Sequence, residues 1–205
     1  MRLNKNKLLI VVAILIGVSP VLSSGQDVTP GASPARIVGN PGARVTIEVF
    51  IDYQCPPCER FNEQLKKIEA KHKNDVKIIL RNLPLSPMHL NAVAAARTAE
   101  AAGQQGKFRE MVNLLFSERS SWADSKEART MFTSFARRLD LNMNRFLADM
   151  DSELVGERIR LDIERAQSLG VEGTPTVFLN GKKLSIEDLF NFDSLSDQIR
   201  KETNR

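Results

Sequence analysis

The only two cysteines of this 205-residue chain, Cys55 and Cys58, are separated by two prolines. They follow residues 45–54 (VTIEVFIDYQ), whose apolar and β-branched side chains predict a buried strand. Over residues 58–68, apolar side chains recur at helical spacing and predict one buried helix face. The pair therefore lies at a strand-to-helix junction. Cysteines spaced in this way close and reopen a small disulfide, so the feature predicts an α/β fold with a redox-active pair.

Residues 1–25 have the pattern of an export signal. A basic start is followed by an apolar run over residues 8–18 and by small residues ending at Gly25. The alternative is an uncleaved membrane anchor, because Val21 and Leu22 extend the apolar run. In either case we expect the folded part to be periplasmic or otherwise extracytoplasmic.

The charge balance argues against nucleic acid as a partner. The formal net charge of +4 includes three basic side chains, and no acidic ones, in residues 1–25. The remaining chain carries 26 basic and 25 acidic residues, and these are interspersed rather than gathered into a basic stripe.

The rest of the chain divides into a tether and one domain. Residues 26–40 are rich in Gly, Pro and small polar residues and predict a tether, and residues 41–205 contain enough apolar residues for one core. The run at 76–80 predicts a second buried strand parallel to the first. From about 86 to 169 nearly every apolar stripe has helical spacing, which predicts a helical insertion.

The C-terminal part returns to strand. Residues 176–179 predict a strand, and Asn180-Gly181 predicts a two-residue hairpin with a partner strand near residues 182–184. We expect a final helix over about residues 186–200.

Two motifs carry a family resemblance. Residues 50–58 (FIDYQCPPC) and 173–181 (GTPTVFLNG) resemble the DsbA-like branch of the thioredoxin superfamily, over about residues 40–202. The resemblance implies an α/β fold with a thioredoxin-like core and an inserted helical subdomain. It also implies that Pro175 is cis beside the cysteines and that Thr174 faces Cys55. A membrane-embedded, quinone-linked reoxidase is the partner that it implies.

The two sulfurs are expected to play different parts. Cys55 precedes the helix, where unpaired N–H groups and the helix dipole favour a thiolate, so its pKa is expected below the free-thiol value of about 8.5. Cys58 lies one turn into the helix on its apolar face, where burial suppresses the thiolate. We therefore predict that Cys55 attacks and forms the mixed disulfide and that Cys58 resolves it.

The residues between the sulfurs tune this chemistry. Pro56 suits the first helical position, but Pro56 and Pro57 together remove two N–H donors from the thiolate, and no histidine lies between the cysteines. We predict a Cys55 less activated than in the strongest oxidants of the family.

Substrate contacts are expected on three further residues. The backbone of Thr174 is expected to be extended because Pro175 follows it, and to pair with a peptide substrate as an added strand. Tyr53 has two open interpretations: it lines a substrate groove, or it packs beside the motif.

One acidic residue departs from the pattern of many thioredoxin-like proteins, which place a buried acid six residues before the first cysteine. That position is Val49 here, and Glu48 precedes it. Strand alternation places the two on opposite faces, so Glu48 either has an active-site role of its own or is a sheet-face residue with a local partner.

We predict no cofactor and no metal. A zinc site needs about four ligands, and beyond the cysteine pair the chain offers only His72 and His89, in different segments.

Three functions remain open. The first is an oxidant that forms disulfides in exported proteins. The second is a reductase or isomerase that uses the same pair, an alternative kept by the resemblance of Thr174 to the residue found in family isomerases. The third is a chaperone or binding module with a passive cysteine pair. We favour the first, as a monomer acting on exported protein thiols.

Overall fold

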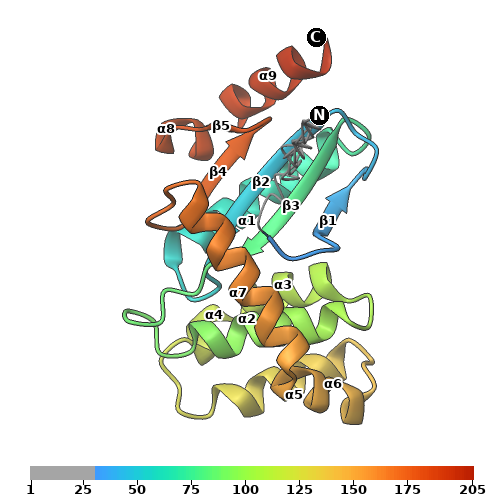
Figure 1. Ribbon diagram of the computed structural model, residues 1–205, viewed down its shortest axis with the longest axis vertical. Helices are drawn as coiled ribbons and strands as arrows, with labels where there is room; N and C mark the ends of the chain where they lie inside the picture. Colours follow the sequence, from blue (N-terminus) through green and yellow to red (C-terminus); the bar gives the residue numbers. More distant parts are fainter. Residues whose placement is uncertain (1–30) are drawn as a thin grey trace, which may run out of the picture.

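A single mixed sheet forms the centre of the computed structural model, which describes residues 31–205 (Figure 1). Its strands lie in the order β1-β3-β2-β4-β5. Their bounds are β1 Arg36–Gly39, β2 Val45–Ile51, β3 Val76–Asn82, β4 Thr176–Leu179 and β5 Lys182–Lys183. β2 pairs parallel with β3 and antiparallel with β4, which confirms the predicted parallel pair.

The helices fall into two groups. The core group is α1 Pro56–Lys71, α8 Ile186–Phe190 and α9 Phe192–Thr203. The inserted group, between β3 and β4, is α2 Ala92–Gly103, α3 Phe108–Ser117, α4 Arg119–Trp122, α5 Ala128–Arg138, α6 Met143–Asp151 and α7 Glu153–Ser168. Figure 1 shows α2–α6 gathered beyond one end of the strands, with α7 leading back toward β4. The fold is thus a thioredoxin-like core with an inserted helical subdomain.

The alternation of β2 separates two apolar layers. Ile47 and Val49 are fully buried in the main core, which includes the α1 residues Phe61, Leu65 and Ile68. Phe50 points to the opposite face, where a smaller cluster packs below α7. Both faces of this central strand are therefore covered, as expected for a strand without exposed side chains.

The predicted hairpin is present. Asn180 and Gly181 both have positive φ, 46° and 81°, and connect β4 to β5 in antiparallel register. This is the conformation that an Asn-Gly pair favours in a two-residue turn.

The predicted tether is wrong for its last part. Arg36–Gly39 form the edge strand β1, which pairs antiparallel with β3. The Arg36 guanidinium anchors this strand through an ion pair to the buried Glu100 at 2.8 Å, a long-range contact that composition does not reveal. The predicted signal peptide and the first residues of the tether lie outside the described residues.

The C-terminal helix is also divided. Asn191 separates α8 from α9, and its side chain accepts a hydrogen bond from Ser194 N at 3.0 Å. An N-cap of this kind begins a new helix and explains the break in the single helix predicted over 186–200.

A buried polar network joins the helical subdomain to the sheet. The Asp162 carboxylate of α7 accepts hydrogen bonds from Ala32 N, from Arg81 Nη1 and from both nitrogens of Asn82, at 3.0–3.1 Å. Glu100 of α2 binds Asn82 Nδ2 at 2.9 Å, and Arg158 and Arg36 as ion pairs. The last residue of β3 is therefore held by two helices of the insertion.

Asp162→Ala is expected to lower the free energy of unfolding by about 3–5 kcal/mol, because it leaves Arg81 and two backbone N–H groups buried with lost partners. Urea denaturation measures the change. The control is Asp151→Ala, which removes the exposed Arg129–Asp151 pair and should cost less than about 1 kcal/mol. Equal losses of unfolding free energy in the two variants would show that the Asp162 network does not stabilise the attachment of the helical subdomain to the sheet.

Candidate active site

The cysteine pair begins α1, at the carboxyl end of β2. Cys55 is the N-cap residue, its N–H donates to Asp52 O at 3.2 Å, and the two prolines occupy the first two helical positions. The N–H of Cys58 donates to Cys55 O at 3.0 Å. This confirms the predicted strand-to-helix junction.

Both cysteines are free thiols in different environments. Cys58 is fully buried on the apolar face of α1, whereas Cys55 retains 6% exposure. Hydrogen bonding from the Cys58 thiol lowers the pKa of Cys55 to about 6, against an opposing effect of burial. Burial raises the pKa of Cys58 well above its ordinary value. The asymmetry expected between the two sulfurs is therefore present.

The lowered pKa of Cys55 has a consequence for stability. Its thiol is more acidic in the folded protein than in the unfolded chain, so the reduced protein gains stability as the pH rises above about 6. That contribution is complete above the unfolded-chain pKa and is lost as the pH falls through about 6.

The loop before β4 reaches the pair from the far end of the sequence. The Thr174–Pro175 bond is cis, as the resemblance implied, and Cys55 Sγ donates to Thr174 O at 3.4 Å. The Thr174 hydroxyl is buried and has no hydrogen-bond partner among the described residues. It is thus available to donate to the Cys55 thiolate, and this interaction, made when the thiol ionises, is a further influence that lowers the pKa of Cys55.

The structure decides between the two interpretations of Tyr53. Its side chain is 1% exposed, its ring packs 5.5 Å from that of Phe116, and its hydroxyl donates to Asn82 Oδ1 at 3.1 Å. Tyr53 is a packing residue behind the motif, so its prediction as a substrate-binding residue is wrong: a side chain that points inward from this turn has no access to substrate.

Glu48 is a sheet-face residue with local partners. It forms ion pairs with Arg81 of β3 and Arg165 of α7, both at 3.0 Å. Val49 lies on the opposite face in the main core. Glu48 therefore does not approach the cysteines from the side of α1.

Two polar residues of the turn before Cys55, Asp52 and Gln54, were not singled out from the sequence. Asp52 is buried and binds His89 Nδ1 at 2.7 Å, and Gln54 Oε1 accepts from Asn91 N at 2.8 Å. Both contacts attach the loop after β3 to the turn before Cys55. The sequence does show two hydrophilic residues, Asp52 and Gln54, directly after a buried strand. Their partners could not be predicted from it, because the parallel pairing of β2 and β3 is what brings the loop after β3 to them.

A small pocket adjoins the cis-proline loop. It has a volume of about 240 Å³, and its apolar lining includes Pro175, Leu184, Ile186 and Leu189. Ile186 is 71% exposed, so an apolar surface is open to solvent beside the residues that contact Cys55.

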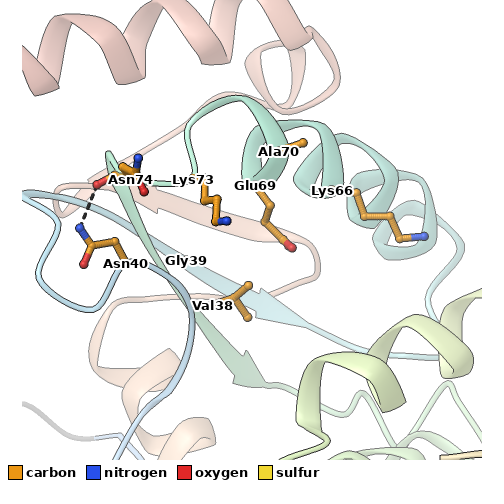
Figure 2. A pocket seen from close by; sticks show the side chains of 8 residues that line it. All are labelled: Val38, Gly39, Asn40, Lys66, Glu69, Ala70, Lys73 and Asn74. Carbon is orange, nitrogen blue, oxygen red and sulfur yellow. Dashed lines mark hydrogen bonds between the residues drawn. The ribbon is translucent and has the colours of Figure 1, made fainter.

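A larger pocket of about 680 Å³ lies between β1 and the second half of α1 (Figure 2). Figure 2 shows Lys66, Glu69 and Lys73 above Val38, with Asn40 Nδ2 donating to Asn74 O at 2.9 Å. Neither cysteine nor any residue of the cis-proline loop lines it. We do not assign it to the redox site.

The remaining histidine, His72, has a local side-chain partner. His72 ends α1, is buried and lies with Nε2 2.8 Å from Ser196 Oγ. Within residues 31–205, no group of three or more His, Cys, Asp and Glu side chains is arranged to hold a metal ion.

The family model described as thioredoxin matches residues 32–201. The chain belongs to the thioredoxin family. The match includes both the cysteine pair and the cis-proline loop.

Solved structures show which branch of the thioredoxin family the fold resembles. BdbD from Bacillus subtilis is 22% identical with a TM-score of 0.74, over 86% of this chain and 98% of that one. A thioredoxin-like oxidoreductase from Silicibacter pomeroyi is 28% identical with a TM-score of 0.66, over 82% and 92%. Alpha-DsbA1 from Wolbachia pipientis is 18% identical with a TM-score of 0.70, over 84% and 92%. At these identities the comparison shows that this thioredoxin-family chain shares its fold with those proteins.

Curated relatives are much longer proteins. The Na(+)/H(+) antiporter NhaA 1 of Salinispora arenicola is 32% identical over 186 residues, which is 90% of this chain but 27% of the antiporter. This thioredoxin-family chain thus spans about a quarter of the length of that relative. Among residues 31–205, no helix has both the length and the apolar character needed to cross a membrane.

The iodoacetamide reaction rate of the reduced protein is expected to rise about tenfold per pH unit below pH 6 and then to level off, because only the Cys55 thiolate reacts. Cys58→Ala should move the midpoint to higher pH, since it removes the hydrogen bond that most lowers the pKa of Cys55. A wild-type midpoint near the free-thiol value of about 8.5, or near 4, would contradict the geometry.

Proposed function

We propose that this protein introduces disulfides into exported proteins, with Cys55 as the attacking and mixed-disulfide-forming sulfur and Cys58 as the resolving one. The observation that carries the proposal is the asymmetry of the pair: a stabilised Cys55 thiolate beside a buried, neutral Cys58. Stabilising a thiolate favours the reduced pair, so it makes the disulfide form a better oxidant.

The exchange proceeds through two displacements. A client thiolate attacks Cys55 Sγ of the oxidised pair, forms a client–Cys55 disulfide and releases Cys58, which takes up a proton. A second client thiolate then attacks the client sulfur of that mixed disulfide and expels Cys55 as a thiolate. The client has lost two electrons and two protons overall, and the pair is reduced, with Cys58 as a thiol and Cys55 as a thiolate. A membrane-embedded, quinone-linked reoxidase takes these electrons to restore the disulfide.

Client recognition is proposed at the cis-proline loop. Thr174 presents its backbone beside Cys55, where an extended client segment is able to pair as an added strand. The adjoining pocket at Leu184, Ile186 and Leu189 suits an apolar client side chain near the reacting cysteine. Such a site fits unfolded chains, which expose apolar residues and cysteines together.

The extracytoplasmic location is part of the proposal. It rests on the signal pattern of residues 1–25, and oxidising compartments are where disulfides persist. We further propose that the protein acts as a monomer and needs no cofactor beyond the cysteine pair.

Catalytic amounts of the oxidised protein are expected to accelerate disulfide formation in reduced ribonuclease, and Cys55→Ser should abolish this, because the sulfur that forms the mixed disulfide is absent. Cys58→Ser is the matched variant: it should also lose turnover, but its Cys55 thiolate should attack a disulfide of scrambled ribonuclease and remain as a mixed disulfide, visible by mass spectrometry. Unchanged folding assistance in Cys55→Ser would favour the binding-module alternative.

Equilibration with glutathione is expected to give a reduction potential between about −270 and −120 mV, the values of a reductase and a strong oxidant. Both prolines withhold N–H donors from the Cys55 thiolate, which keeps the pair short of the strongest oxidants. A potential near −270 mV would favour the reductase alternative. Efficient isomerisation of scrambled ribonuclease would favour the isomerase alternative.

A further inference from the structure

The carboxylate closest in sequence to the attacking sulfur is buried and fully engaged. Asp52 follows the last residue of β2 and is 1% exposed. Its Oδ1 accepts from Gln54 N at 2.7 Å, and its Oδ2 accepts from Leu85 N at 2.8 Å. The remaining partner of Oδ2 is His89 Nδ1, at 2.7 Å. Since an ionised carboxylate only accepts, Nδ1 of His89 carries the proton in this contact.

His89 provides a link between this buried charge and solvent. It belongs to the loop between β3 and α2, and its side chain is 19% exposed while that of Asp52 is fully buried. The imidazole that donates to Asp52 Oδ2 is therefore the part of this contact that reaches solvent.

The charge of Asp52 acts on Cys55. Hydrogen bonding from Cys58 is the largest influence on the pKa of Cys55 and lowers it; burial raises it, and the negative charge of Asp52 is a smaller raising influence. The backbone carbonyl of Asp52 also accepts the Cys55 N–H at 3.2 Å, so the two residues have a fixed relation in one tight turn.

Other charges around this turn compensate each other. Arg119 of α4 approaches Gln54 O at 3.4 Å, and it is ion-paired with Glu59 of α1 at 2.5 Å. The charge of Asp52 has no such strong cation within the described contacts, and His89 is its only titratable partner there.

We propose that Asp52 and His89 are a positioning pair that sets how readily Cys55 gives up its proton. Asp52 opposes formation of the thiolate, and His89, which donates to the Asp52 carboxylate, weakens that opposition. The pair deepens the proposed function and rests on it: it makes the reactivity of Cys55 depend on the contact between Asp52 and the loop after β3.

The test is the pH profile of the Cys55 thiolate in reduced protein, followed by its ultraviolet absorbance and by iodoacetamide reaction. Asp52→Asn should shift the profile to lower pH by about one unit, which corresponds to about a tenfold faster reaction at pH 5. His89→Gln should shift it to higher pH, because the imidazole that offsets the charge of Asp52 is removed. The double variant should resemble Asp52→Asn, since His89 acts through Asp52.

The controls separate this effect from loss of structure and from the proposed function. His72→Gln makes the same substitution at the other end of α1, about 24 Å along the helix, and should leave the profile unmoved. Shifts in the same direction for Asp52→Asn and His89→Gln, or no shift in either, would overturn the inference. A wild-type protein that fails to oxidise ribonuclease would instead overturn the proposed function, because the thiolate profiles do not depend on client turnover.

Discussion

The register of β2 with its two neighbours is the constraint on which the site depends. Parallel pairing sets Ile51 opposite Asn82, and antiparallel pairing sets Phe50 opposite Thr176. The carboxyl ends of β2 and β3 and the amino end of β4 therefore meet at one edge of the sheet. The turn to Cys55, the loop that carries His89, and Pro175 all leave from that edge, although they are far apart in sequence.

The same edge is the joint between the sheet and the inserted helices. Asn82 is held by Asp162 and Glu100, and its Oδ1 accepts the hydroxyl of Tyr53. Tyr53 stands between Asp52 and Gln54 in the turn before Cys55. The buried network around Asn82 thus also fixes the turn before Cys55. The same hydrogen bonds therefore attach the helical subdomain to the sheet and help to position the attacking sulfur.

Local patterns predicted much of this arrangement, and long-range pairing explains the rest. The CPPC junction, the parallel strands, the helical insertion and the Asn-Gly hairpin each have a signal within a few residues. The β1 strand has none, because its place depends on the free edge of β3 and on Glu100. Tyr53 was ambiguous for the same reason: the direction of its side chain follows from Asn82 and Phe116, which reach it only in the fold.

The two prolines and the Asp52–His89 contact lie on opposite sides of Cys55, and both affect its pKa. The prolines withhold backbone donors at the start of α1, where a helix would otherwise stabilise the thiolate more strongly. Asp52 adds an opposing negative charge from the β2 side. Against both stand the hydrogen bonds from Cys58 and Thr174, which still lower the pKa of Cys55 to about 6. In the proposed positioning pair, His89 is the side chain through which the loop after β3 acts on this balance.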